Sequence, residues 1–348
     1  MIRRRMSRPI SIGDVTVGGG APVVVQSMAK TDTRDARATI KQIRRLEEFG
    51  CQIVRLAVPD GEAAASIPTI KHLISIPLIA DIHFDHRLAL LALEGGVDGL
   101  RLNPGNISDP EQIKEVVLAA KERNVPIRIG VNAGSLPPAE NKEQTIVERM
   151  VGSALEQIKL LESLNFELIK VSLKAFDVPD TVAANQALAE RMPYPIHLGI
   201  TEAGTTRGGV IRSAAGIGIL LHHGIGDTIR VSLTGDPCEE VSAGYEILKA
   251  LDLSQRGPTL ISCPSCGRTE VDIIGLANAV EDRLSKLKKS IKVAVMGCVV
   301  NGPGEARDAD VGIACGKGRG VIFRNGKQVC TVDEADFLSA LMAEVDRV

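Results

Sequence analysis

Short apolar segments and longer helical segments alternate along residues 20–235. Each repeat has an apolar strand pattern, a turn with polar residues or glycine, and a helical stretch such as 34–49 or 145–164. The predicted strands are Val23–Met28, Ile53–Val58, Pro77–Ile82, Gly99–Asn103, Ile127–Asn132, Leu168–Leu173, Ile196–Thr201 and Thr228–Leu233. Such alternation predicts parallel strands with right-handed crossovers, and eight units in roughly 215 residues match a (β/α)8 barrel. An open doubly wound sheet is the alternative, but no Gly-x-Gly-x-x-Gly follows the first strand.

The pattern changes after residue 253. Residues 254–258 contain serine, glycine and proline and read as a linker. The remainder predicts a β-α-β unit, a hairpin over Val321–Val329 with an Asn-Gly turn, and a closing helix over Asp333–Val345. We therefore predict an α/β protein in which a TIM-like barrel (1–253) precedes a smaller α+β domain (259–348).

The predicted barrel strands have one apolar face and one polar face. Side chains alternate across a strand, so Ile129 and Val131 share one face of the fifth strand, and Arg128 and Asn132 share the other. The apolar face must pack on the helices, so the polar face points into the barrel. A barrel that is only a scaffold fills its interior with Val, Ile and Leu. The inward polar positions of interest are Arg55, Asp81, His83, Arg101, Arg128, Asn132, Lys174, His197, Arg230 and Ser232.

Cations outnumber carboxylates among these positions. A core ion pair would explain any single inward arginine, because charged residues are almost never buried without a partner. Only Asp81 and Glu202 lie at strand ends as possible counter-charges for the convergent cations. The excess positive charge predicts a polyanion site, most simply for a diphosphate held by charge-assisted hydrogen bonds. Glycine-containing loops after the seventh and eighth strands lie where barrels commonly bind phosphate.

Three of the seven cysteines lie beside proline and glycine turns in the second domain. Cys263 and Cys266 form a Cys-x-x-Cys turn, which directs two thiolates at one point and suits a metal or a redox disulfide. Cys298 ends an apolar strand, and Glu305 follows seven residues later. Three thiolates and a carboxylate fit an iron–sulfur cluster. The remaining cysteines are predicted to be inert core residues: Cys51, Cys238, Cys315 and Cys330.

The composition argues against several classes of protein. The net charge is −2, aromatic residues make up 2% and tryptophan is absent, which disfavours stacking platforms for nucleic acids. No apolar run approaches the roughly 18 residues of a membrane span. The basic N-terminus lacks the apolar stretch of a secretory signal. An odd number of thiols in such a chain predicts a reducing, cytoplasmic environment.

Four further strings complete a recognisable set of motifs. They are Val25-Gln-Ser-Met28, Leu100-Arg-Leu-Asn-Pro-Gly-Asn106, Gly199-Ile-Thr-Glu-Ala-Gly204 and Gly224-Ile-Gly-Asp-Thr-Ile-Arg-Val-Ser-Leu-Thr234. Together with Cys263-Pro-Ser-Cys-Gly-Arg268 and Cys298-Val-Val-Asn-Gly-Pro-Gly-Glu305, they carry a resemblance that covers essentially the whole chain. The chain resembles the bacterial 4-hydroxy-3-methylbut-2-enyl diphosphate synthases of the methylerythritol phosphate route to isoprenoids.

This resemblance implies a reaction and a cofactor. The substrate would be 2-C-methyl-D-erythritol 2,4-cyclodiphosphate, which is opened and reduced by two electrons with loss of water. The resemblance maps a [4Fe-4S] cluster onto Cys263, Cys266, Cys298 and Glu305. It also implies flavodoxin or ferredoxin as electron donor, and a homodimer in which one chain's cluster domain covers the other chain's barrel. Glu202, at the end of the seventh strand, is our candidate for the proton donor that the leaving water requires.

Two functions of other classes stay open from the residues alone. Lys174 at the end of the sixth strand would serve an aldolase as a Schiff-base lysine. The cysteines would then hold a structural zinc ion, with Cys315 as a fourth ligand. Alternatively, the cysteine domain would be a redox sensor that regulates a ligand-binding barrel.

Overall fold

The computed structural model describes residues 2–83, 85–102, 109–136, 143–285, 287, 289–298, 304 and 309–348. The chain divides into two compact units, Met1–Ser254 and Gln255–Val348. No helix in the described ranges has the length and apolar character needed to cross a membrane.

The first unit is a barrel of eight parallel strands, which the sequence predicts within a few residues at each end. The strands are β3 (Val24–Met28), β4 (Ile53–Ala57), β5 (Leu78–Asp81), β6 (Gly99–Leu102), β7 (Ile127–Asn132), β8 (Ile169–Lys174), β9 (His197–Leu198) and β10 (Thr228–Ile229). Their hydrogen-bonded order is β8-β7-β6-β5-β4-β3-β10-β9. A parallel bridge between Val171 and Ile196 joins the two ends of that order. The barrel is therefore closed, and the open doubly wound alternative is excluded.

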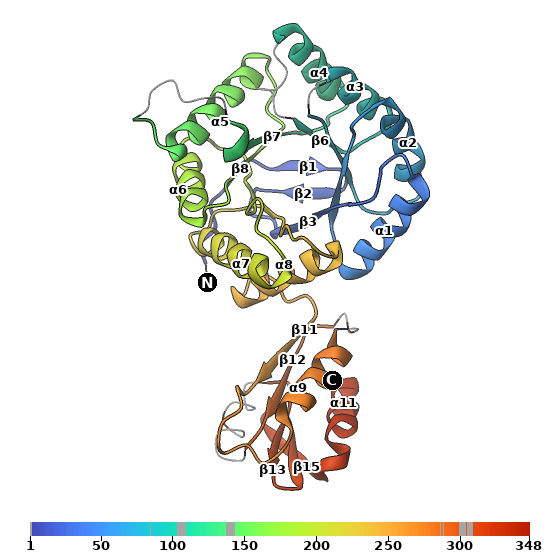
Figure 1. Cartoon of the computed structure of the whole chain (residues 1–348), viewed down its shortest axis with the longest axis vertical. Helices are drawn as coiled ribbons and strands as arrows, with labels where there is room; N and C mark the ends of the chain where they lie inside the picture. Colours follow the sequence, from blue (N-terminus) through green and yellow to red (C-terminus); the bar gives the residue numbers. More distant parts are fainter. Residues whose placement is uncertain are drawn as a thin grey trace. The chain divides into compact units, whose positions relative to one another are not determined.

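Helices surround the barrel on its outer side (Figure 1). They are α1 (Ala36–Phe49), α2 (Gly61–His72), α3 (His86–Glu94), α4 (Pro110–Glu122), α5 (Ile146–Ser163), α6 (Val178–Ala189), α7 (Thr206–His222) and α8 (Pro237–Ala250). Most begin at an aspartate whose carboxylate accepts a backbone N–H of the first turn, as Asp60 does from Ala63 at 3.0 Å. Thr145 and Glu148 form a reciprocal capping box at the start of α5. The apolar face of each strand packs on this helix layer.

A short hairpin at the N-terminal end of the barrel is absent from the sequence prediction. Strands β1 (Ile10–Ile12) and β2 (Val15–Val17) pair antiparallel and lie across the centre of the ring in Figure 1. Ile12 and Val17 pack with Val24 and Ile53, which lie at the starts of β3 and β4. The hairpin thus fills one end of the barrel with apolar side chains and leaves polar chemistry to the other end.

The second unit contains a mixed five-stranded sheet, and the α-helices α9 and α11 lie in its described part. The elements are β11 (Pro258–Ser262), α9 (Ile273–Leu284), β12 (Ile291–Met296), β13 (Val311–Gly316), β14 (Arg319–Arg324), β15 (Lys327–Asp333) and α11 (Phe337–Arg347). Strands β11, β12 and β13 are parallel, and β13, β14 and β15 are antiparallel. The predicted hairpin is confirmed, because Asn325 and Gly326 adopt φ values of 49° and 72°, as a two-residue turn requires.

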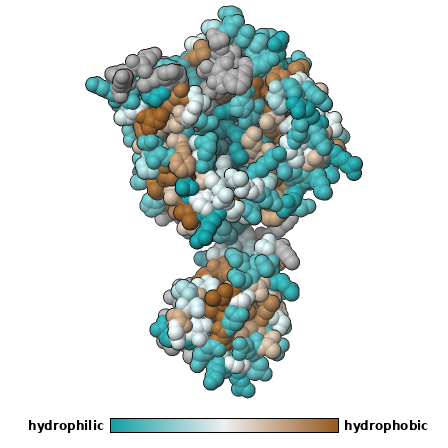
Figure 2. All heavy atoms as spheres, viewed as in Figure 1, coloured by the Kyte–Doolittle hydropathy of each residue, from teal (hydrophilic) through white to brown (hydrophobic). Residues whose placement is uncertain are grey.

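Hydrophilic residues cover most of the barrel face shown in Figure 2, and apolar residues form small separate groups on it. The apolar side chains of the barrel instead form one continuous buried cluster between strands and helices. A second cluster lies between the sheet of the second unit and α9 and α11. Each unit therefore has its own hydrophobic core.

Candidate functional site

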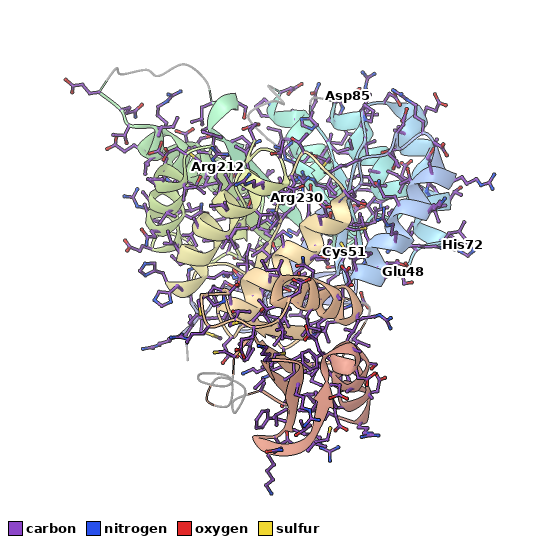
Figure 3. All side chains as sticks on the ribbon, turned by 60° about the horizontal axis from the view of Figure 1, so that its bottom comes forward. Glu48, Cys51, His72, Asp85, Arg212 and Arg230 are labelled. Atoms are coloured by element: carbon purple, nitrogen blue, oxygen red, sulfur yellow. The ribbon has the colours of Figure 1, made fainter. Side chains whose placement is uncertain are left out.

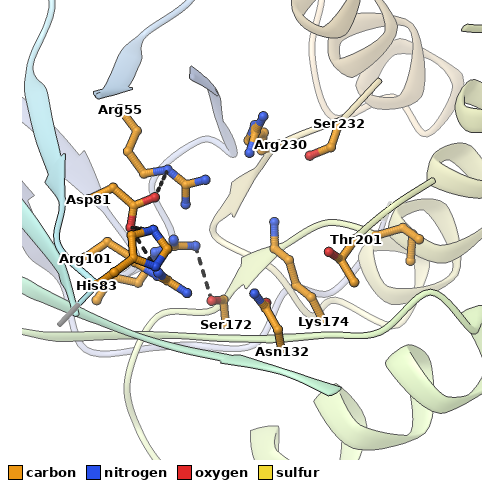
Figure 4. A pocket seen from close by; sticks show the side chains of 12 residues that line it. Arg55, Asp81, His83, Arg101, Asn132, Ser172, Lys174, Thr201, Arg230 and Ser232 are labelled. Carbon is orange, nitrogen blue, oxygen red and sulfur yellow. Dashed lines mark hydrogen bonds and ion pairs between the residues drawn. The ribbon is translucent and has the colours of Figure 1, made fainter. Parts of the chain in front are cut away.

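A polar pocket lies inside the barrel at the carboxyl ends of its strands (Figure 4). The structure brings all nine predicted substrate-binding side chains to its wall, together with Ser172, Ile200 and Thr201. The predicted residues are Arg55, Asp81, His83, Arg101, Arg128, Asn132, Lys174, Arg230 and Ser232. They come from six strands or strand ends, so barrel closure is what gathers them. Parity along each strand was the signal that identified them.

Asp81 links two of the arginines in this pocket. One carboxylate oxygen lies 3.3 Å from Arg55 Nε, and the other lies 3.1 Å from Arg101 Nη1. His83 Nε2 is 3.7 Å from the same carboxylate. Burial alone would raise the pKa of Asp81, but Arg55, a hydrogen bond from His83 and Arg101 together hold it well below its usual range. Asp81 therefore stays charged and fixes the two guanidinium groups side by side.

In Arg55 and Arg128, burial outweighs the nearby negative charge, so the charged form is disfavoured. Burial lowers the pKa of Arg55 to about 10, and Asp81 opposes this shift. Burial also lowers the pKa of Arg128, and the neighbouring Arg55 and Arg101 add to the effect. Arg128 is 3% exposed and donates to Ser172 Oγ at 3.2 Å. The pocket thus concentrates positive charge that the described carboxylates neutralise only in part.

Two lysines on β8 lie in the same barrel interior. Lys174 Nζ is 3.3 Å from His197 Nε2, and His197 Nδ1 is 2.7 Å from Thr228 Oγ1. Lys170 is 1% exposed, and its Nζ has no hydrogen-bond partner among the described residues. Burial, reinforced by nearby cations, lowers the pKa values of Lys170, Lys174 and His197. His197 is thus a hydrogen-bonded core group that also contacts a pocket lysine.

Arg230 lies inside the ring of helices, whereas Glu48 and His72 stand on its outer side (Figure 3). Arg230 Nη2 is 3.8 Å from Glu240 Oε2. Burial lowers the pKa of Arg230, and Glu240 and Asp81 oppose the shift. Sequence reasoning missed Glu240, a residue of α8 that is 1% exposed. Acidic residues are common in the first turn of a helix, where they interact favourably with its N-terminus. Glu240 is in such a position, and nothing in the local sequence indicates that it is buried.

Glu202 lies beside the pocket and not in its wall. It follows Thr201, which lines the pocket, and its own side chain is exposed. Within the described ranges it forms no ion pair, so of the two possible counter-charges at the strand ends only Asp81 pairs with pocket arginines, and Glu240 pairs with Arg230. Its backbone φ of 48° falls in the left-handed region, which is uncommon for a residue other than glycine. Strain of this kind is concentrated at functional sites.

The predicted cluster ligands lie in the second unit. Cys263 is half-buried at the end of β11, Cys266 is exposed, and Cys298 is half-buried after β12. Among the described residues, no three Cys, His, Asp or Glu side chains are close enough together to hold a metal ion. Glu305 lies outside the described residues.

Gly297 shapes the environment of Cys263. Its N–H donates to Cys263 Sγ at 3.2 Å, and a Cβ at Gly297 would lie 3.3 Å from that sulfur. The same Cβ would lie 3.1 Å from the Thr269 methyl carbon. Any side chain here would crowd the thiol, so the glycine leaves room beside it. A backbone N–H directed at a cysteine sulfur is typical of iron–sulfur sites, where it tunes the reduction potential. The donor set fits a thiolate-bound cluster.

The other four cysteines divide into two groups. Cys51, Cys238 and Cys315 are buried, as predicted. Burial raises the pKa to about 12 for Cys51 and Cys315 and to about 11 for Cys238, which makes these thiols inert. Cys330 is exposed on β15, so its assignment to the core is wrong. Cys315 packs in the hydrophobic core of the second unit.

Comparison with known proteins identifies the family. The GcpE TIM-barrel domain matches residues 7–245, and the GcpE protein C-terminal domain matches residues 259–347. The chain belongs to the GcpE family. A relative from Dehalococcoides mccartyi is 61% identical over 345 residues, which is 99% of this chain and 99% of the relative. One from Geobacter sulfurreducens is 59% identical over 344 residues, 98% of each chain. Both are called 4-hydroxy-3-methylbut-2-en-1-yl diphosphate synthase (flavodoxin).

Solved structures resemble the barrel of this GcpE protein at low sequence identity. Xanthomonas albilineans dihydropteroate synthase gives a TM-score of 0.51 at 13% identity and covers 71% of this chain and 97% of its own. The Yersinia pestis enzyme gives 0.52 at 12% identity, with 70% and 98% covered. At such identities the likeness shows the fold alone.

Family membership decides among the interpretations that the sequence left open. The resemblance to the diphosphate synthases and the α/β barrel fold are confirmed. Burial lowers the pKa of Lys174, which would also suit a Schiff-base lysine. The relatives are nevertheless named diphosphate synthases, so neither the aldolase nor the sensor alternative finds support.

Proposed function

We propose that this protein catalyses the reductive ring opening of 2-C-methyl-D-erythritol 2,4-cyclodiphosphate to 4-hydroxy-3-methylbut-2-enyl diphosphate. The observation that carries the proposal is the convergence of Arg55, Arg101, Arg128, Lys174 and Arg230 in one pocket at the carboxyl ends of the barrel strands. Full-length identity of 61% to a synthase of that product supports the same conclusion. Active sites of barrels of this type lie at this end.

The cations would bind the diphosphate and orient the carbon skeleton. Guanidinium groups suit phosphate oxygens because their N–H groups form two parallel hydrogen bonds. Asp81 holds Arg55 and Arg101 in place before the ligand arrives, so little ordering remains to be done on binding. Asn132 and Ser232 would supply neutral hydrogen bonds at the same wall, and His83 would add a further donor beside Asp81.

Cys263, Cys266, Cys298 and Glu305 would hold a [4Fe-4S] cluster. When bound, the cluster supplies single electrons and a Lewis-acidic iron for the carbon–oxygen bond that breaks. Gly297 leaves space beside Cys263 and donates its N–H to that sulfur. A carboxylate is a harder and more easily displaced ligand than a thiolate, so Glu305 would be the exchangeable position.

Glu202 would give the proton that lets the hydroxyl group leave as water. It is next to Thr201 at the edge of the pocket, where an exposed carboxyl group can exchange protons with solvent. The left-handed backbone at this residue would aim the side chain in a way that ordinary strand geometry does not.

The names of the relatives support a proposal for the electron donor, and the family resemblance supports one for the assembly. The names of the relatives include flavodoxin, and we propose flavodoxin, or the equivalent ferredoxin, as the donor here. We also propose a homodimer with each active site formed from two chains. The seven thiols suit a reducing compartment such as the cytoplasm.

Anaerobic turnover tests the function. The full chain, purified without oxygen, is incubated with the cyclic diphosphate and reduced flavodoxin, and the product is measured by mass spectrometry. We expect product only when both are present. A colourless protein that binds zinc and leaves the cyclic diphosphate unchanged would refute the proposal.

A further inference from the structure

The backbone pairing of the barrel stops early at the junction of β3 and β10. Only Thr228 and Ile229 of β10 pair with Val24 and Val25 of β3. The next residues of the chain, 230–233, are outside any regular strand, and they include the pocket residues Arg230 and Ser232. On the β9 side this segment is held by Arg230 N–H donating to Leu198 O at 3.0 Å. On the β3 side, other groups must replace the missing ladder.

Lys30 and Glu240 occupy this gap. Glu240 Oε1 accepts the Leu233 N–H at 2.9 Å and lies 2.9 Å from Lys30 Nζ. Lys30 Nζ donates to Leu233 O at 2.7 Å and to Gly235 O at 2.6 Å. These contacts satisfy backbone groups of the 230–235 segment on the side where no strand pairs with them. We call these two side chains the Lys30–Glu240 clamp.

The second oxygen of Glu240 connects the clamp to the pocket. Oε2 lies 3.8 Å from Arg230 Nη2 and accepts from Ser27 Oγ at 3.4 Å. Helix α8 approaches β3 closely, since a Cβ at Gly244 would lie 3.2 Å from a Val25 methyl carbon. That close approach lets the short glutamate side chain reach between the two strand ends from the helix layer. Arg230 is therefore shared between the clamp and whatever binds in the pocket.

We propose that the Lys30–Glu240 clamp positions Arg230 and Ser232 and sets how strongly Arg230 attracts a diphosphate. The proposal rests on the proposed function, because it assumes that the pocket binds a diphosphate. Glu240 draws the Arg230 guanidinium towards the barrel wall, and Lys30 offsets part of that pull. Neither clamp residue lines the pocket, so both act through Arg230 and the 230–235 segment.

The clamp predicts opposite effects for its two members. In Glu240→Gln the amide oxygen still accepts from Leu233 N–H and Lys30, while the charge that competes for Arg230 is gone. The dissociation constant of inorganic pyrophosphate should fall about three- to tenfold, as expected for one charge removed near a partly buried partner. In Lys30→Met the carboxylate loses its nearest cation and attracts Arg230 more strongly. The dissociation constant should then rise by a similar factor of about three to ten.

Calorimetric titration of the full, anaerobically purified chain measures these constants without turnover. Pyrophosphate and the cyclic diphosphate serve as separate ligands, and no electron donor is added. Glu239→Gln is the matched control, since Glu239 is an exposed neighbour on α8 that pairs with Thr206 Oγ at 2.9 Å. Its affinity should stay within about twofold of wild type. The double variant Lys30→Met/Glu240→Gln removes both charges and should also stay within about twofold.

The outcomes separate the clamp from the function on which it rests. A wild-type chain that binds neither anion overturns the proposed function, and the clamp's role with it. If the wild type binds the anions and both single variants bind them more weakly, these residues only maintain the fold. That result overturns the proposed role of the clamp but not the proposed function. If Glu240→Gln does not fold, Lys30→Met is compared with Lys30→Arg, which keeps the charge and should bind more tightly. Equal affinities in that pair overturn the clamp.

Discussion

Replacing Asp81 with asparagine separates the stability of the barrel from its affinity for anions. The carboxylate of Asp81 is 3% exposed and pairs with Arg55 at 3.3 Å and Arg101 at 3.1 Å. Removing one partner of a buried ion pair costs about 3–5 kcal/mol, because the other charge stays buried without compensation. Both guanidinium groups line the pocket and are not sealed in the core, so we expect the lower end, about 3 kcal/mol, for Asp81→Asn. The same change removes a negative charge from the pocket, and we expect this gain to exceed the loss of the order that Asp81 imposes on Arg55 and Arg101, so pyrophosphate should bind more tightly.

Tyrosine fluorescence during urea unfolding gives a direct assay. The chain has two tyrosines and no tryptophan, and both Tyr194 and Tyr245 lie in the barrel unit. The signal therefore reports the barrel separately from the second unit. With a urea dependence of about 3 kcal/mol/M, a loss of about 3 kcal/mol lowers the midpoint by about 1 M. Glu111→Gln is the control, because its exposed pair with Lys114 at 3.3 Å should contribute less than about 1 kcal/mol.

The pH dependence of this difference provides the refuting result. The folded pKa of Asp81 lies well below its usual range, so its stabilisation is present above the unfolded pKa of about 3.9 and is lost as pH falls towards the folded pKa. The difference in unfolding free energy between wild type and Asp81→Asn should be constant from about pH 5 to 8 and should shrink below about pH 4. Equal urea midpoints at neutral pH, or a gap that grows on acidification, would show that Asp81 does not hold the arginines as described.

The remaining predictions concern the cluster, the proton donor, the anion site and the assembly. Cys298→Ala should lose most of its iron and visible absorption after anaerobic purification, and full iron content would refute the ligand assignment. Glu202→Gln should lower turnover while the substrate dissociation constant changes little; the reverse pattern contradicts its role. Neutralising Arg55 or Arg230 should weaken substrate binding by roughly 1.5–3 kcal/mol in calorimetry, and unchanged binding contradicts the anion site. When equal amounts of the Glu202→Gln and Cys298→Ala variants are mixed and exchange subunits, about a quarter of the sites should be intact if each site is formed by two chains. No site should be intact if each is formed within one chain.

The barrel could be predicted from sequence because each strand carries a repeated local signal. In β7, Ile127, Ile129 and Val131 alternate with Arg128 and Asn132, and this period of two defines both the strand and its inward face. The same parity identifies the pocket wall, since parallel strands end at one edge of the sheet. No pairwise contact had to be known in advance.

The features that were missed depend on tertiary position. Strands β1 and β2 have three residues each, too few for a period to be recognised, and their apolar side chains matter only because the barrel end lies beneath them. Glu240 reads as a favourable acidic residue in the first turn of α8, and its burial follows from the close packing of that helix on β3. The left-handed backbone of Glu202 was also not predicted, because a residue other than glycine rarely adopts it and the sequence does not mark it.

The charge balance of the pocket links ligand binding to the stability of the barrel. Among the described residues, only Asp81 and Glu240 form ion pairs with pocket arginines, and burial lowers the pKa values of Arg128, Lys170 and Lys174. The barrel's own residues therefore leave buried cations without enough counter-charge, which lowers the stability of the barrel. A bound diphosphate supplies the missing negative charge and raises those pKa values, so its binding should draw protons onto the lysines. Since the unfolded chain has no such site, the same ligand should also raise the barrel's unfolding midpoint. The buried cations that lower the stability of the barrel are thus the groups that favour binding of an anion within it.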